Sequence, residues 1–165
     1  MRKQKGFSLI ELLIVVAIIL IIAAIAIPNL LRAKMAANES GAASAIRTIN
    51  TAEISYQSQY NTYANTMTML GNGVAGACVP AAANACLIDF SLSSATVAAN
   101  AKSGYIFAVA APTATTYTAG GAPRVWNRDG VASFCSNEDA VVRRITTNNN
   151  VPTNVPATCL TYTAL

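Results

Sequence analysis

Apolar residues gather in one long run near the N-terminus of the chain. Between positions 7 and 27 the only polar side chains are those of Ser8 and Glu11, and positions 12–27 are apolar without a break. Wound into a helix, these 21 residues rise about 31 Å, which matches the hydrocarbon core of a bilayer. The pattern predicts one membrane-spanning helix over residues 7–27, and no second run of this kind follows in the sequence.

A periodic pattern follows farther along the chain. One face at helical spacing carries Ile46, Ile49, Glu53, Tyr56, Tyr60 and Tyr63, and the opposite face carries Arg47, Asn50, Thr51 and Ser58. Because a mostly apolar face packs on a core, we expect one helix from Phe7 to Tyr60 whose outer half covers a globular head. Pro28 removes a helical hydrogen bond and predicts a kink in this helix.

Alternation with a period of two begins at Gly104 and predicts short β-strands. The candidate strands are residues 105–111, stopped by Pro112; 115–118, ended by Gly120 and Gly121; 131–135; and 140–145. Short connections between successive strands favour an antiparallel meander. The expected fold class is therefore α+β, a long N-terminal helix packed on a small antiparallel sheet. Residues 87–101 predict a short helix, and the Thr- and Asn-rich tail after Ile145 predicts irregular structure.

Composition removes most catalytic classes. The 165 residues include no histidine, which excludes Ser-His-Asp and Cys-His catalysis and nearly all catalytic zinc sites. The segment from Gly71 to Gly76 matches G-x-G-x-x-G, but no strand precedes it, so we predict a loop and no dinucleotide cofactor. Asp129, Glu138 and Asp139 lie at predicted turns, where acidic residues are common, and we predict no metal there. We expect no catalytic residue, cofactor or metal.

Positive charge is concentrated at the N-terminus. The net charge is +4, and Arg2, Lys3 and Lys5 supply most of it, so the remainder of the chain is nearly neutral and favours no specific nucleic-acid partner. By the positive-inside rule, the basic end stays in the cytoplasm and residues 30–165 cross the membrane.

An ordinary secretory signal peptide is the alternative for the N-terminal run. Ala24, Ile25 and Ala26 before Ile27 resemble a small-residue cleavage site. Glu11 argues against a signal peptide. A carboxylate inside a membrane helix costs about 2.5–3.5 kcal/mol, and a signal peptide gives this acid neither a partner nor a function.

The four cysteines are Cys78, Cys86, Cys135 and Cys159. They allow three pairings, and the nearest-neighbour choice is Cys78–Cys86 with Cys135–Cys159. Disulfides persist on the exported side of a membrane, and a metal site is disfavoured because the spacing contains no C-x-x-C. We expect two intramolecular disulfides.

The segment from Lys5 to Ile19, KGFSLIELLIVVAII, resembles the class III signal of type IV pilins and their pseudopilin relatives. The resemblance implies that a prepilin peptidase cuts after Gly6, that the new N-terminal residue Phe7 is N-methylated, and that Glu11 guides assembly. Phe7 and Glu11 are four residues apart and share a helix face. Cleavage frees the amine of Phe7, which in a packed array of helices can pair with Glu11 of a neighbour. The pairing offsets much of the free energy that it costs to bury the ammonium and the carboxylate separately.

The resemblance and the patterns together predict four parts. They are a removed leader (1–6), a transmembrane and filament-core helix (7–27), an outer amphipathic helix (28–63) and a globular head (64–165). The expected function is that of a structural subunit of a type IV pilus or related filament; the alternatives are the major pseudopilin of a type II secretion system and a secreted soluble binding domain. The expected partners are other copies of the chain, the inner membrane before assembly, prepilin peptidase and the pilus assembly machinery. We expect a single-pass inner-membrane protein that later enters an extracellular filament.

Overall fold

The computed structural model describes residues 7–72, 76–146, 159–161 and 163–165. The expected leader with its Gly6 cleavage site, the middle of the Gly71–Gly76 segment and most of the Thr- and Asn-rich tail lie outside the described residues. The chain forms two compact units, the first ending at Lys34 and the second beginning at Met35. Each unit is described by itself.

The described elements begin with four helices or helical turns in the first hundred residues, and a sheet with one further 3-10 turn follows. They are α1 (Leu9–Tyr60), α2 (Met67–Leu70), α3 (Phe90–Ser93), the 3-10 turns η1 (Ala98–Asn100) and η2 (Cys159–Thr161), and the strands β1 (Tyr105–Thr113), β2 (Thr116–Pro123), β3 (Ser133–Asn137), β4 (Arg143–Ile145) and β5 (Thr163–Ala164). Consecutive strands are neighbours in the order β1-β2-β3-β4-β5, and every pair is antiparallel. The α+β fold and the meander are confirmed.

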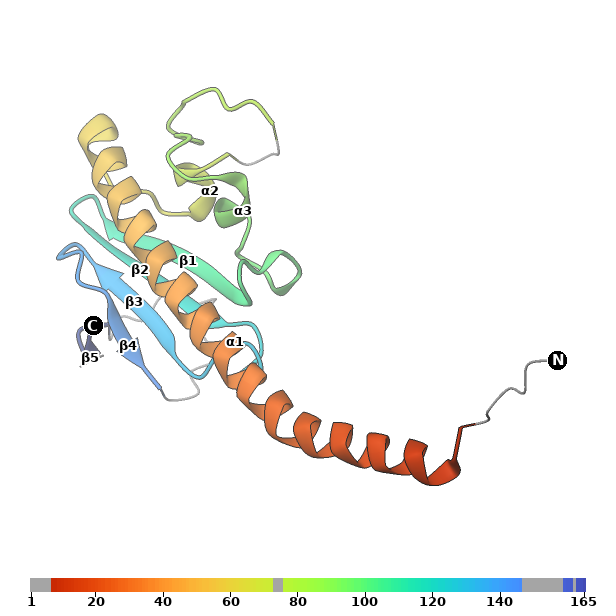
Figure 1. Cartoon of the computed structure of the whole chain (residues 1–165). Coiled ribbons are helices and arrows are strands. Elements are labelled where there is room, and N and C mark those ends of the chain that lie inside the picture. The colour runs from red at the N-terminus through yellow and green to blue at the C-terminus, as the bar shows by residue number, and fades with distance from the viewer. Residues whose placement is uncertain (1–6, 73–75, 147–158, 162) are drawn as a thin grey trace. The chain divides into compact units, whose positions relative to one another are not determined.

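In the second unit, α1 crosses one face of the sheet (Figure 1). Ile46, Ile49 and Tyr56 of the expected apolar face are buried there, in a core shared with Phe107 of β1. Burying an aliphatic or aromatic side chain of this size stabilises a fold by about 1.5–3 kcal/mol. The helix ends at Tyr60, and Tyr63 packs beyond its end, with its ring centroid 4.7 Å from that of Tyr117.

Two strands extend past their expected ends. β1 continues through Pro112 to Thr113, and its register with β2 shifts between Ala110 and Thr113. Among the described strands β1 pairs only with β2, and a proline is tolerated on an edge strand or at such an irregularity. β2 continues past Gly120 and Gly121 to Pro123. A Cβ on Gly121 would lie 2.9 Å from the ring of Phe107. Here glycine makes room for an aromatic ring, and it does not end the strand.

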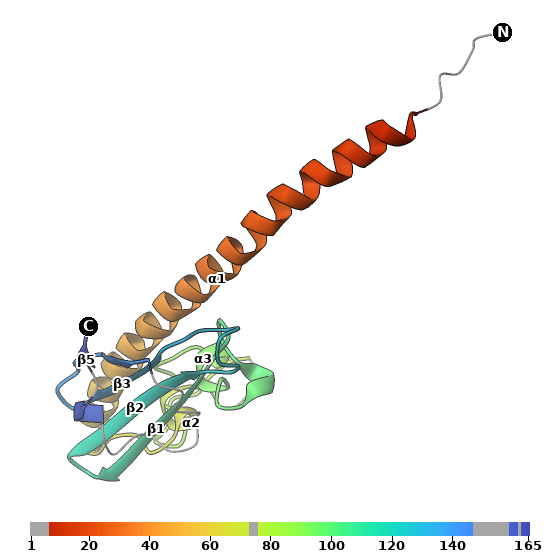
Figure 2. The ribbon, with the colours of Figure 1, turned by 90° about the horizontal axis from the view of Figure 1, so that it is seen from below.

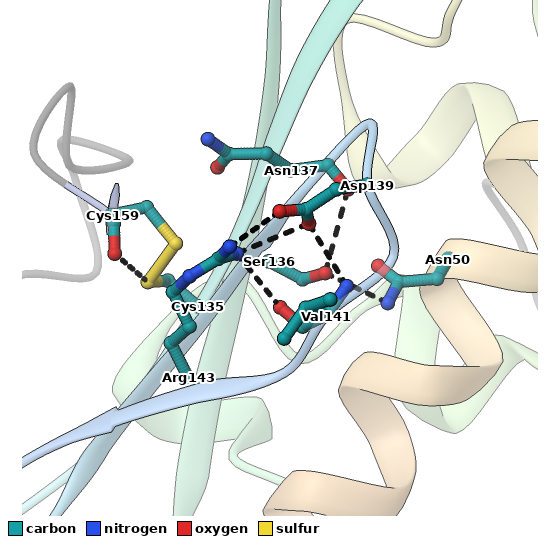
Figure 3. The surroundings of a disulfide bond; sticks show 8 residues. All are labelled: Asn50, Cys135, Ser136, Asn137, Asp139, Val141, Arg143 and Cys159. Carbon is teal, nitrogen blue, oxygen red and sulfur yellow. Dashed lines mark hydrogen bonds and ion pairs between the residues drawn. A yellow bond between two sulfur atoms is a disulfide. The ribbon is translucent and has the colours of Figure 1, made fainter. Parts of the chain in front are cut away.

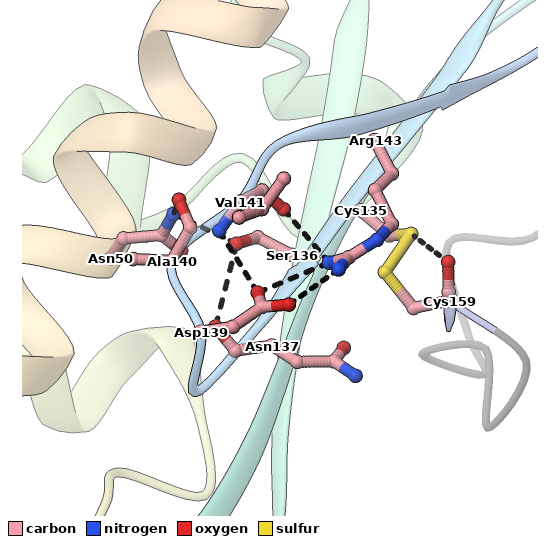
Figure 4. A network of polar contacts seen from close by, with 9 residues as sticks. All are labelled: Asn50, Cys135, Ser136, Asn137, Asp139, Ala140, Val141, Arg143 and Cys159. Carbon is pink, nitrogen blue, oxygen red and sulfur yellow. Dashed lines mark hydrogen bonds and ion pairs between the residues drawn. A yellow bond between two sulfur atoms is a disulfide. The ribbon is translucent and has the colours of Figure 1, made fainter. Parts of the chain in front are cut away.

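Asn50 was expected on the exposed face of α1, and that expectation is wrong. Asn50 is 4% exposed and reaches the sheet, as Figure 4 shows. Its Nδ2 donates to Ser136 Oγ at 2.8 Å and to Ala140 O at 3.2 Å, and its Oδ1 accepts from Tyr117 Oη at 3.1 Å. A buried amide is stable when both of its ends are paired, so this side chain fixes α1 to β2 and to the β3–β4 turn.

The contacts of Asn38 and Glu39 fasten α1 to the sheet at the other end of the head. Asn38 Nδ2 donates to Asp129 O at 2.8 Å. Glu39 accepts from Val131 N at 2.8 Å through Oε1 and from Arg144 Nη2 at 2.9 Å through Oε2. One turn of helix is thus tied to the β2–β3 connection and to β4.

Both expected disulfides are confirmed, Cys78–Cys86 and Cys135–Cys159. Successive residues of a strand face opposite sides of a sheet: Phe134 and Ser136 of β3 face α1, and Cys135 points the other way (Figure 3). Cys135 and Cys159 are both buried, so their bond pins the C-terminal residues to the far face of the sheet. The described part of the tail adds a fifth strand, β5, which was not expected.

Candidate assembly site

The two polar side chains of the otherwise apolar N-terminal run, Ser8 and Glu11, lie at the start of α1. Leu9 is the first helical residue, so Ser8 is the N-cap and Glu11 is the third residue of the helix. Glu11 Oε2 accepts from Ser8 N at 3.0 Å, while Glu11 N donates to Ser8 O at 3.1 Å. This is the glutamate half of a capping box, in which an acid satisfies a backbone donor that the helix leaves unpaired.

The capping role of Glu11 was missed in the sequence, although S-x-x-E before an apolar run is its signature. The consequence is that Glu11 is held in place within its own chain before any partner arrives. Its negative charge also lies at the positive end of the helix dipole, where a carboxylate is favoured. Phe7 lies just outside the helix and is 81% exposed.

The first unit presents apolar side chains on every side of α1. Between Phe7 and Lys34 each side chain is exposed except Ala23, which is partly covered. Within the described residues, α1 is the one helix long and apolar enough to cross a membrane. The helix runs unbroken through Pro28, and the kink expected there stays a prediction. An unpartnered apolar surface of this length requires lipid or other protein around it.

Two of the three carboxylates expected at turns in the head, Asp129 and Asp139, form ion pairs with arginines. Burial raises the pKa of Asp129, but hydrogen bonds from Arg128 and Arg124 outweigh it and hold that pKa below its ordinary value. The hydrogen bond from Arg143 lowers the pKa of Asp139. In the described part of the chain, no three metal-ligating side chains come together.

Glu53 is a carboxylate on the buried side of α1, and it is fully buried. Its Oε2 accepts from Ala64 N at 2.9 Å, which fastens the turn that follows α1. Among the residues that the structure describes, its Oε1 has no hydrogen-bond partner. Burial raises the pKa of Glu53 to about 7, and the hydrogen bond from Ala64 offsets only part of this rise.

We expect the head to lose stability as pH rises from about 4.5 to 7. A carboxyl whose pKa is higher in the folded than in the unfolded state binds more protons when the protein is folded. Its unfavourable contribution to the stability of the fold therefore grows as pH rises from the unfolded pKa to the folded pKa. Above the folded pKa this contribution is constant. The shift corresponds to about 3 kcal/mol. Glu53→Gln is expected to remove most of this dependence, measured as the free energy of unfolding of the full chain in detergent at a series of pH values. Glu138→Gln, at an exposed position, is the matched control. An unchanged pH profile in Glu53→Gln would contradict the assignment.

Comparison with known proteins adds to this geometry. Residues 1–27 match the model of the prokaryotic N-terminal methylation motif. The chain is 44% identical over 70 residues to the type IV wide pilus major component PilA4 of Thermus thermophilus, and 41% identical over 69 residues to the type IV major pilin protein PilA of Myxococcus xanthus. Over these aligned stretches the chain is homologous to type IV pilins. Each match covers 42% of this chain, and the chain spans 53% of the first pilin and 31% of the second.

The homology to pilins agrees with the fold described above, a long apolar N-terminal helix on a small antiparallel sheet. The methylation motif includes Phe7, Ser8 and Glu11, and in the structure Glu11 accepts the hydrogen bond from the N-cap Ser8. Gly6, the expected cleavage position, belongs to the motif but lies outside the described residues.

Proposed function

We propose that this protein is a structural subunit of a type IV pilus or a closely related filament, and that it polymerises through α1. One observation carries the proposal: the part of α1 before Pro28 is apolar apart from Glu11, is exposed at every residue except the partly covered Ala23, and lies within an N-terminal methylation motif. Such a surface serves equally in lipid and in the core of a bundle, since both surround it with apolar atoms.

Processing of the precursor is the first step of the proposed mechanism. A prepilin peptidase hydrolyses the peptide bond between Gly6 and Phe7, removes the basic leader, and the new amine of Phe7 receives a methyl group. The methylated amine stays positive. Before cleavage this charge does not exist at Phe7, and the three basic residues of the leader oppose close packing of helices at that level.

Pairing between subunits is the second step. When a processed helix joins the filament, its Phe7 amine enters apolar surroundings and meets Glu11 of the neighbouring subunit. An isolated buried charge is very costly, whereas a hydrogen-bonded pair offsets much of that cost. Glu11 is already positioned by its contact with Ser8 N, so little side-chain freedom is lost when the pair forms.

Membrane storage precedes assembly in this proposal. Residues 7–27 cross the inner membrane once with the N-terminus in the cytoplasm, and the second unit lies on the exported side, where its two disulfides persist. The assembly machinery then transfers the subunit into an extracellular filament. The head covers the outside of this filament and performs no catalysis.

The mature N-terminus and the presence of filaments test the proposal together. Intact-mass analysis of sheared surface filaments is expected to give a chain that begins at Phe7 and carries one added methyl group. Electron micrographs of cells without the gene should lack these filaments. Gly6→Arg is the matched control, because its bulky charged side chain should block cleavage and leave the full precursor in the membrane. A mature chain that begins at Ile27 would instead establish an ordinary secretory signal.

A further inference from the structure

Within the connection between β2 and β3, residues 124–130 form a compact loop that we call the basal loop. Asp129 O of this loop accepts the hydrogen bond from Asn38 Nδ2, and Arg124 N donates to Gly104 O just before β1. Met35 begins the second unit, so the basal loop lies beside the first residues of α1 in that unit. Figures 1 and 2 show the strands β2 and β3, which this loop connects, in two views.

The basal loop exposes an unusual combination of side chains. It reads Arg-Val-Trp-Asn-Arg-Asp-Gly, and Arg128 and Arg124 have side chains that are 59% and 38% exposed. Val125 is 38% exposed and Trp126 is partly exposed between them. Both guanidinium groups lie against Asp129, whose side chain is only 6% exposed. The loop therefore has a net charge of +1, with its cations outward and its one acid inward.

Several contacts hold this loop in one shape. Asn127 has a left-handed backbone with φ of 60°, and its N donates to Gly130 O at 3.0 Å. A Cβ on Gly130 would lie 2.2 Å from the buried Tyr105 Oη, so the chain passes directly over that ring. A rigid loop loses little conformational entropy when it binds a surface.

The basal loop is tethered by a short stretch of chain to the segment expected to cross the membrane. Asn38, which contacts the loop, follows Ile27 by only eleven residues. Arg32 and Lys34 add two positive charges on the chain between them.

We propose that the basal loop binds an anionic lipid surface while the subunit is stored in the membrane, with Arg124 and Arg128 on lipid phosphates and Trp126 at the interface. This inference rests on the proposed insertion of residues 7–27. Arginines attract anionic headgroups, and tryptophan favours the boundary between apolar and wet surroundings. The turn between β3 and β4 carries Glu138 and Asp139, so it offers an anionic surface no such attraction.

Trp126 is the only tryptophan of the chain, so its fluorescence reports on the basal loop alone. The full chain is reconstituted into vesicles of phosphatidylcholine, or of phosphatidylcholine mixed with phosphatidylglycerol. Flotation of the vesicles records insertion of the helix separately. With phosphatidylglycerol present we expect a blue shift of Trp126 emission and protection from the neutral quencher acrylamide, both reversed by high salt.

Charge-removing variants make the test specific. Arg128→Gln is expected to weaken the contact about fivefold, and Arg128→Lys should retain it. Arg47→Gln is the matched control, because Arg47 is an exposed cation nine residues farther along α1 than Asn38 and should leave the contact unchanged.

Three results would overturn the inference. The first is flotation of the chain with equal acrylamide quenching in both kinds of vesicle, which would leave the proposed membrane insertion intact. The second is protection that follows the protein-to-lipid ratio instead of the lipid charge, which would assign the loop to a second copy of the chain. The third is failure of the chain to float, which would remove the membrane insertion and this inference together.

Discussion

Glu11→Val, expressed as the only subunit, is expected to abolish surface filaments while cleavage and membrane insertion persist. Insertion should be unchanged or improved, because valine removes the cost of a buried acid. Assembly should fail, since each incoming Phe7 amine would then enter the filament core unpaired, and an unmatched buried charge costs about 3–5 kcal/mol. The measurement is the yield of sheared filaments relative to the amount of cleaved subunit in the membrane.

Two further variants separate the charge of Glu11 from its capping role. Gln accepts a hydrogen bond from Ser8 N as Glu does, but it is neutral. If charge pairing drives assembly, Glu11→Gln should behave like Glu11→Val, and Glu11→Asp, which keeps the charge at shorter reach, should be intermediate. Normal filament yield from Glu11→Val would show that apolar packing alone builds the filament.

Removal of the Cys135–Cys159 disulfide is expected to reduce filament yield and head stability more than removal of Cys78–Cys86. The two bonds close segments with sequence separations of 24 and 8 residues, and loop-closure estimates give about 3.5 and about 2.5 kcal/mol. Cys135 and Cys159 are also fully buried, so their replacement leaves a cavity beneath the C-terminal strand, whereas Cys78 and Cys86 are partly exposed.

The comparison requires two double variants, Cys135→Ala with Cys159→Ala and Cys78→Ala with Cys86→Ala. Thermal unfolding of each chain in detergent and the yield of sheared filaments are the two measurements. A larger loss from the Cys78–Cys86 pair would mean that the loop from Cys78 to Cys86 contributes more to the stability of the head. Tyr56 Oη also holds this loop, by a hydrogen bond of 2.7 Å to Ala82 O.

Periodicity predicted those features that depend on one stretch of chain. The buried face of α1 with Ile46, Ile49 and Tyr56 followed from its spacing, because a helix places every third or fourth residue on one side. The four main strands followed from alternation and turn residues, and the disulfides from nearest-neighbour spacing. Glu11 was singled out as an unusual acid, but its capping contact was overlooked although its motif was visible.

Features that depend on distant partners could not be predicted from the sequence. Asn50 is buried because Ser136 and Tyr117, 86 and 67 residues later, supply its hydrogen bonds. β1 passes through Pro112 because it lies at the edge of the sheet, which is a property of the whole strand order. The basal loop looked like an ordinary turn, and its place at the base of the head is evident only from its contact with Asn38.

The fastening of α1 at Asn38 and Glu39 determines how the head bears mechanical load. A pull on α1 from its N-terminal side reaches the sheet first at these two residues, which are tied to the β2–β3 connection and to β4. Inside the head, α1 is held again at Asn50 and at Tyr56, so the force is shared among attachments to separate strands and loops. Because these contacts carry the force at the same time, pulling α1 out of the head requires all of them to break. The head should therefore resist stretching well beyond the strength of any single contact, and extension under tension should begin in the chain before Met35.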